Sequence, residues 1–263
     1  MGGALAAGPE GSASAVRSRY AQLRGPLEQS PFGKPLLLTS TQTRDTLTGD
    51  IHAVLEQPFE RVRDGLGTAA SWCDALILHP NITSCRPAAD GKAISVQLGK
   101  HQTPASFSYD IAATTGDYLH VQLFAAEGPA GTSDYHIDLE AAPLDPTHTM
   151  LHLVYSHGYG VQARLAMGAY LSTFGKGKVG FTAVGQDAEG RPVYVRDLRG
   201  ALERNAMRYY LCIEAYLQSL SAPPAQRFEK RLQTWYAYTE RYPLQLREEG
   251  DYLALKRNIA RGQ

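Results

Sequence analysis

The residues best suited to chemistry lie in one stretch, residues 150–160, which interleaves apolar, tyrosine and histidine side chains. Alternate side chains of a β-strand point to opposite faces, so Tyr155, His157 and Tyr159 would share one face with Leu153. Hydroxyl and imidazole groups on an otherwise apolar wall are typical of a pocket that fixes the polar end of an apolar ligand. The pattern also fits amphipathic side chains at the solvated rim of a sheet.

Enzymatic chemistry in this stretch would depend on His157, because an imidazole titrates near neutral pH and can act as a general base. A nucleophilic triad is disfavoured: the sequence has no GxSxG motif. Ser156, next to His157, would point to the opposite face of the strand. We therefore assign no catalytic residue and predict no cofactor, with His157 or a tyrosine as the acid or base in an alternative enzymatic interpretation.

A metal site is a second possibility, since His136, Asp138 and Glu140 alternate on one strand and His152 can lie on a neighbouring one. Imidazole and carboxylate groups both bind transition metals. Alternating charged residues are also typical of the solvated face of a sheet. We favour the solvated face and predict no metal.

The three cysteines are Cys73, Cys85 and Cys212, with no CxxC pair and no zinc-finger spacing. Cys212 lies in a helical stretch, where a buried free thiol is expected. Cys73 and Cys85 bracket the end of a short helix and a loop. A disulfide between them would stabilise the fold by about 3 kcal/mol and would require an oxidising compartment. We predict this disulfide; two buried thiols in a reducing cytosol are the alternative.

Composition limits the functional classes. The chain has 263 residues with 26 basic and 26 acidic side chains, and 43% of its residues are hydrophobic. This is globular composition for one large domain or two small ones. Zero net charge argues against a nucleic-acid partner, and no stretch reaches the ~18–20 apolar residues that span a bilayer. The small residues at 1–15 predict a flexible start, which is also compatible with the remnant of a removed export signal.

Hydrophobic spacing predicts the elements that position these residues. Pro58 suits the first turn of a helix, and Phe59, Val62 and Leu66 form one apolar stripe after it. About six strands with short polar turns between them then predict an antiparallel meander. Further helices and a hairpin are expected at 69–76, 163–174, 179–195 (the hairpin), 198–220, 225–242 and 244–259.

Two basic or aromatic segments have a structural and a functional interpretation. Gly175–Lys178 (GKGK) lacks the spacing of a phosphate-binding loop, but as a mobile loop it could gate a pocket or meet a lipid head group. The C-terminal helices carry many aromatic and basic residues. Phe228, Leu232, Trp235 and Tyr242 are spaced as a packing seam, and the mixed charges favour a solvated helix face over a membrane-binding one.

The order of elements resembles that of the START and birch-pollen-allergen-like superfamily. The segment Val54–Val62 (VLEQPFERV) resembles that family's first strand and the helix that opens after it. Trp72 and the paired strands at 135–142 and 150–159 are also similar. The resemblance covers residues 41–220 and departs from the family at 161–196 and after 220. It implies an α+β helix-grip fold, a curved antiparallel sheet wrapped around a long C-terminal helix, with an apolar ligand cavity between them.

The sequence thus predicts a flexible segment at 1–35, a START-like domain at 36–220 and a helical extension packed on it at 221–263. The expected function is to bind or carry an apolar or amphipathic, lipid-like small molecule in the periplasm or outside the cell, with the cytoplasm as the alternative. The rivals are a cyclase-, dehydratase- or hydrolase-like enzyme and an interaction module that uses the C-terminal helices, with a transient membrane or protein partner. The predicted ligand-binding residues are Trp72, Phe107, Tyr109, Tyr155, His157, Tyr159, Tyr209 and Tyr216.

Overall fold

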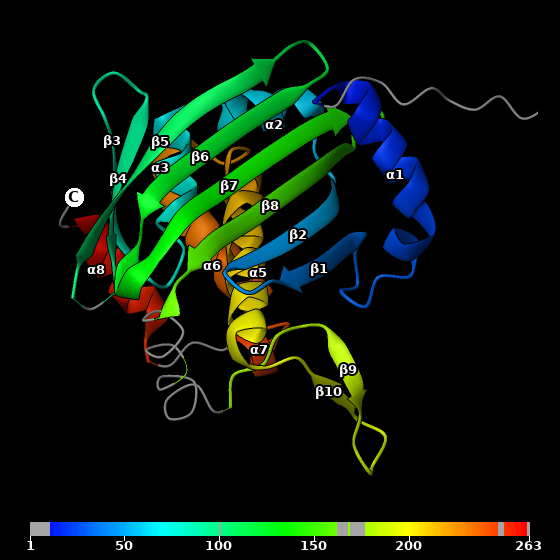
Figure 1. The fold of residues 1–263 in the computed structure, drawn as a ribbon. Helices are drawn as coiled ribbons and strands as arrows, with labels where there is room; N and C mark the ends of the chain where they lie inside the picture. Colours follow the sequence, from blue (N-terminus) through cyan, green and yellow to red (C-terminus); the bar gives the residue numbers. More distant parts are fainter. Residues whose placement is uncertain (1–10, 100, 162–167, 169–176, 247–249, 262–263) are drawn as a thin grey trace, which may run out of the picture.

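One antiparallel sheet dominates the fold of this computed structural model, which describes residues 11–99, 101–161, 168, 177–246 and 250–261 (Figure 1). Its eight strands lie in the order β1-β2-β8-β7-β6-β5-β4-β3. The strands are β1 (Leu36–Gln42), β2 (Thr46–Leu55), β3 (Ile82–Pro87), β4 (Ala93–Leu98), β5 (Thr103–Thr114), β6 (Leu119–Glu127), β7 (Thr132–Pro143) and β8 (Thr149–Tyr159).

The helices and a small separate hairpin complete the described part of the chain. They are α1 (Ala13–Glu28), α2 (Phe59–Leu66), α3 (Ala69–Leu76), α5 (Asp197–Ser219), α6 (Arg227–Thr239), α7 (Pro243–Leu246) and α8 (Tyr252–Arg261), with β9 (Ala183–Gln186) and β10 (Pro192–Tyr194). Short 3-10 turns span Pro129–Gly131 and Pro224–Gln226. None of the described helices combines the length and the apolar character that crossing a membrane requires.

The long helix α5 covers one face of the sheet, here called the inner face, and contacts β1, β2 and β8 (Figure 1). Strands β3 to β8 form a meander, and the β1–β2 hairpin pairs with β8. The predicted helix-grip α+β fold is confirmed by this order. Gly49 allows the close approach of α5 to β2, since a Cβ there would lie 3.1 Å from the Cβ of Ala206.

The alternation predicted for residues 150–160 is confirmed in β8. Leu153, Tyr155, His157 and Tyr159 are buried on the inner face, whereas His152, Val154, Ser156 and Gly158 are partly exposed on the outer face. The outer face is therefore the more polar one, and part of it is covered by α1.

Helix α1 occupies much of the N-terminal segment that was expected to be flexible. Ser12 caps this helix, because its hydroxyl accepts a hydrogen bond from the backbone N–H of Ala15 at 3.2 Å. Its apolar positions repeat at intervals of three and four and pack on Met150 and Ala142 of the outer face; they are Ala13, Val16, Tyr20, Leu23 and Leu27. The sequence pattern at 17–27 is that of a short helix or coil, and the structure shows a helix that begins earlier, at Ala13. The division of the chain into domains stays a prediction.

The predicted disulfide is confirmed: Cys73 of α3 is bonded to Cys85 of β3, and Cys212 is a buried free cysteine. The predicted packing seam is also present, because Leu232 and Trp235 are fully buried. The prediction that the charged side chains of the C-terminal helices lie on a solvated face is wrong in part, since Lys256 is only 2% exposed. The helix predicted at 163–174 lies outside the described residues apart from Gly168, as does Gly175–Lys178 apart from its last two residues.

Candidate functional site

A cavity of about 390 Å³ lies between the inner face of the sheet and the N-terminal half of α5. Most of its wall is aliphatic or aromatic, with side chains from α3, α5 and the seven strands β2 to β8. The loops β4–β5 and β6–β7 also contribute, at one end of the sheet. The apolar lining residues include Leu47, Leu76, Ile82, Val96, Leu98, Ala105, Phe107, Leu123, Ile137, Leu198, Ala201 and Leu202.

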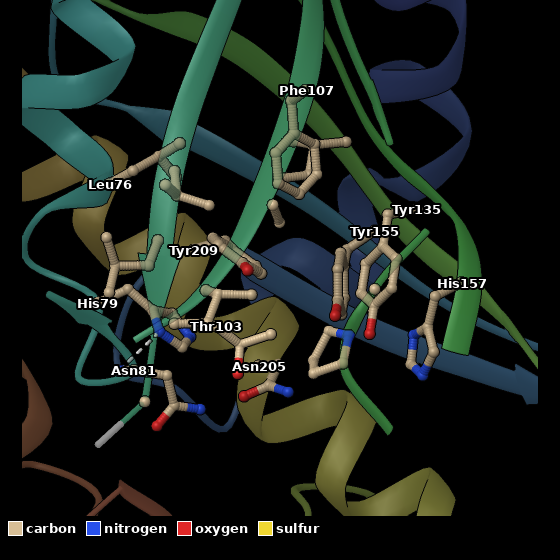
Figure 2. Close-up of a pocket in the computed structure, with 18 of the residues that line it drawn as sticks. Leu76, His79, Asn81, Thr103, Phe107, Tyr135, Tyr155, His157, Asn205 and Tyr209 are labelled. Atoms are coloured by element: carbon tan, nitrogen blue, oxygen red, sulfur yellow. Dashed lines mark hydrogen bonds between the residues drawn. The ribbon is translucent and has the colours of Figure 1, made fainter. Parts of the chain in front are cut away.

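Four aromatic rings form a continuous row in this cavity (Figure 2). Tyr135 of β7 stacks on His157 of β8, with ring centroids 5.0 Å apart. The ring centroid of Tyr155 lies 5.6 Å from that of His157 and 4.9 Å from that of Tyr209 of α5. The row arises because Ile137 and Tyr155 are register partners on β7 and β8, so their inward neighbours Tyr135 and His157 come together. Such a row offers a flat ligand broad apolar contact.

The row continues to His79, which follows α3 and stacks on Tyr209 with ring centroids 4.7 Å apart. The backbone N–H of Asn81 donates a hydrogen bond to Nδ1 of His79 at 3.2 Å. Since Nδ1 accepts, the proton of the neutral ring is on Nε2. That nitrogen is buried and has no hydrogen-bond partner among the described residues. His79 thus supplies an unused donor at the cavity.

Burial keeps two histidines of the cavity wall, His79 and His157, uncharged at neutral pH. It lowers the pKa of His157 to about 4. Burial, and then the positive charges of Arg208 and Lys256, lower the pKa of His79 well below its usual value. The buried Nδ1 of His157 also has no partner among the described residues. An unpaired buried nitrogen is costly, and such an atom in a cavity wall is a natural place for a ligand to bind.

The tyrosines of the row are uncharged as well. Burial raises the pKa of the Tyr155 and Tyr209 hydroxyls above their ordinary range, and the neighbouring tyrosine rings add to the effect. Glu127, exposed on the β6–β7 side, is the one carboxylate among the described lining residues. Apart from the exposed Glu127 and His101, the described wall therefore combines apolar surface with neutral hydrogen-bonding groups.

Of the eight side chains predicted to bind a ligand, the structure places four in the lining of this cavity. These are Phe107, Tyr155, His157 and Tyr209. Their contact with a ligand stays a prediction.

The other four predicted residues lie outside the lining because their polar groups or rings pack elsewhere. The indole N–H of Trp72 and the hydroxyl of Tyr109 both donate to the backbone carbonyl of Leu66, at 3.0 and 3.1 Å. The Tyr159 hydroxyl donates to the carbonyl of Thr43 at 2.7 Å. Tyr216 is buried, and the guanidinium of Arg231 lies 6.0 Å from the centre of its ring.

Sequence reasoning missed His79, Asn81, Tyr135 and Asn205, which also line the cavity. For Asn205 a signal existed, since it lies on one helical stripe with residues 198, 202 and 209. For His79 there was none, because its position depends on packing between distant segments. The carbonyl of His79 accepts a hydrogen bond from Nζ of the buried Lys256 at 2.7 Å, so α8 holds this residue in place.

No protein-family model matches the sequence, and neither does any curated protein. Similar solved structures include a START superfamily protein from Mycobacterium smegmatis, 13% identical with a TM-score of 0.32, over 50% of this chain and 92% of the other. Norcoclaurine synthase from Thalictrum flavum, in complex with dopamine and hydroxybenzaldehyde, is 11% identical with a TM-score of 0.36, over 53% and 88%. An aromatase/cyclase from Streptomyces is 11% identical with a TM-score of 0.35, over 48% and 85%.

At these identities and TM-scores the likeness concerns the fold and carries no conclusion about ligand or activity. The strand order and the placement of α5 in this chain are themselves those of a helix-grip fold. The resemblance to the START and birch-pollen-allergen-like superfamily that the sequence predicted is thus a resemblance of fold.

Proposed function

We propose that this protein binds and carries an uncharged apolar or amphipathic small molecule, lipid-like in character, without transforming it. The observation that carries the proposal is the cavity of about 390 Å³ between the sheet and α5. Its size and its wall, apolar with a few converging polar groups, are typical of small-molecule sites.

The chemistry of the wall indicates the polar end of the ligand. A carboxylate or phosphate buried beside neutral groups would be unpaired and costly, and the described lining contains no lysine or arginine. The proton on Nε2 of His79 can be donated to a hydroxyl or carbonyl oxygen. We therefore expect an alcohol, ketone, phenol or amide at the polar end.

Acid–base catalysis fits the same groups less well. A general base is most effective when its pKa lies near the working pH, whereas burial lowers that of His157 to about 4. A catalytic triad also requires a carboxylate that orients the histidine through a hydrogen bond. Among the described residues, Nδ1 of His157 has no such partner. An interaction module is disfavoured because Leu232 and Trp235 of the C-terminal helices are buried.

The disulfide favours an oxidising compartment, because such bonds persist in the periplasm and outside the cell and are rare in a reducing cytosol. We propose a periplasmic or secreted location on this ground. A lipid-like cargo is compatible with it, since an apolar molecule needs a carrier to cross an aqueous space.

The test compares two tryptophan substitutions on the same strand. Ala105 of β5 lines the cavity, whereas Ala112 of β5 is exposed. Titration with the neutral apolar dye Nile red should show saturable 1:1 binding to the wild type and to Ala112→Trp. Ala105→Trp should lose the binding while keeping its circular dichroism spectrum. Equal binding by both variants would refute the cavity as the site.

A competition experiment tests the nature of the polar end. Long-chain alcohols should displace Nile red at lower concentration than carboxylic acids of the same chain length at neutral pH. Mass spectrometry of an organic extract of the purified protein identifies any bound molecule. Preferential displacement by the acids would contradict the proposed neutral ligand.

A further inference from the structure

A second cluster of titratable side chains lies on the outer face of the sheet, on the opposite side from the cavity. Strand register places His52 of β2 beside His152 of β8, and His152 beside Glu140 of β7. Asp50 precedes His52 by two residues on the same face of β2. The cluster therefore draws on three adjacent strands.

The side-chain geometry brings three potential metal ligands together. One ligand atom from each of Asp50, His52 and His152 lies within 4.8 Å of the other two. The His152 Nε2–H donates to Oδ1 of Asp50 at 2.6 Å. The rings of His52 and His152 are stacked, with centroids 4.2 Å apart.

His52 is the unexplained member of this cluster. It is only 7% exposed, and its buried Nε2 has no hydrogen-bond partner among the described residues. Leaving a buried nitrogen unpaired costs about 1–3 kcal/mol. A cation bound between Asp50, His52 and His152 would use this nitrogen.

The surroundings of His152 resemble the support of a metal-binding histidine. Its Nδ1 lies 3.4 Å from Oε2 of Glu140, and the other oxygen of Glu140 accepts a hydrogen bond from the Tyr118 hydroxyl. Histidine ligands commonly donate their second ring N–H to a carboxylate in this way, which directs the other nitrogen at the metal. Here Nε2 is directed at Asp50.

We propose that Asp50, His52 and His152 form a binding site for a divalent transition metal of the Zn²⁺ type. Two imidazole nitrogens and one carboxylate oxygen are an established ligand set for Zn²⁺, with metal–ligand distances of about 2.0–2.2 Å. Binding replaces the proton between His152 Nε2 and Asp50, which moves these two atoms apart, and small side-chain rotations bring the His52 nitrogen to the metal. The site does not depend on the cavity or its proposed ligand.

A small cavity of about 220 Å³ lies beneath α1 beside this cluster, with His152 and Glu140 in its wall. Arg19 of α1 also lines this cavity. A water molecule or a small anion beside Arg19 would complete a four-coordinate site.

The experiment titrates ZnCl₂ into the chelator-treated full chain by calorimetry. We expect one Zn²⁺ per wild-type chain and no saturable binding to His52→Leu. Glu140→Gln should weaken binding by about 10–100-fold. The control is His136→Leu, which removes an exposed histidine from the same face of the sheet and should bind as the wild type does.

Absence of stoichiometric binding by the wild type would overturn the proposal and leave the cluster as a set of ion pairs. Retention of binding by His52→Leu, or an equal loss in His136→Leu, would also overturn it. If His52→Leu does not fold, X-ray absorption spectroscopy of the Zn²⁺-loaded wild type tests the proposal instead, because it reports which ligands surround the metal. Two imidazoles and one carboxylate support the site, and any other ligand set refutes it.

Discussion

Replacing His157 by phenylalanine should make the stability of the protein less sensitive to acid. His157 is 7% exposed, and burial lowers its pKa to about 4 in the folded state, against about 6.5 for an unfolded chain. The folded state therefore excludes a proton that the unfolded state binds as the pH falls below 6.5. The contribution of this histidine to stability is fully present above pH 6.5 and is lost between pH 6.5 and 4.

The size of the effect follows from the pKa difference. Each pKa unit corresponds to 1.36 kcal/mol, so the wild type should lose about 3 kcal/mol through His157 between pH 7 and pH 4. His157→Phe keeps an aromatic ring against Tyr135 and removes the titrating group. Other groups, including His79, are common to both proteins and cancel in the comparison.

The measurement is urea unfolding of ligand-free wild type and His157→Phe at several pH values from 4 to 7.5. The free energy of unfolding of the variant, relative to the wild type, should rise by about 3 kcal/mol as the pH falls over this range. His136→Phe, on the exposed side of the sheet, controls for the loss of one histidine. A difference that stays constant with pH would refute the assignment of His157 as a buried neutral group.

Three further variants test what stabilises the fold around the cavity. Replacing Cys73 and Cys85 together by serine should lower the free energy of unfolding by about 3 kcal/mol, measured in urea without reductant. Lys256→Met removes two hydrogen bonds from Nζ to backbone carbonyls, at 2.6 and 2.7 Å. It should lower the free energy of unfolding by about 3 kcal/mol and weaken Nile red binding. Lys230→Met, at an exposed position, should change neither quantity. Glu203→Gln should lower the melting temperature, because this fully buried carboxylate accepts two backbone N–H bonds at 2.6 and 2.9 Å; an unchanged melting temperature would contradict that role.

The elements with local signals could be predicted from the sequence. Phe59, Val62 and Leu66 define the buried side of α2, and the predicted range 69–76 is that of α3. The faces of β8 followed from simple alternation. These predictions succeed because helix and strand periodicity depends on neighbours a few residues apart.

The lining of the cavity could be predicted only in part, because residue type does not reveal the partner of a polar group. Trp72 and Tyr109 were plausible wall residues, but both donate to the same carbonyl of Leu66. The bond from Tyr109 spans 43 residues of sequence. Lys256 was expected in a solvated face for the same reason, although its Nζ binds the carbonyls of His79 and Ile82.

The topology of the sheet explains why two separate sites arise around β8. Alternation that directs Tyr155 and His157 into the cavity necessarily directs His152 to the outer face. The partners of His152 come from β2, which is distant in sequence and pairs with β8 only because the first hairpin joins the last strand of the meander. The sequence offered His136, Asp138, Glu140 and His152 as an alternative metal set but favoured a solvated face, while Asp50 and His52 became visible only in the fold. Since the sheet separates the two groups, Zn²⁺ binding and Nile red binding should respond to different substitutions, and His52→Leu should leave the dye affinity unchanged.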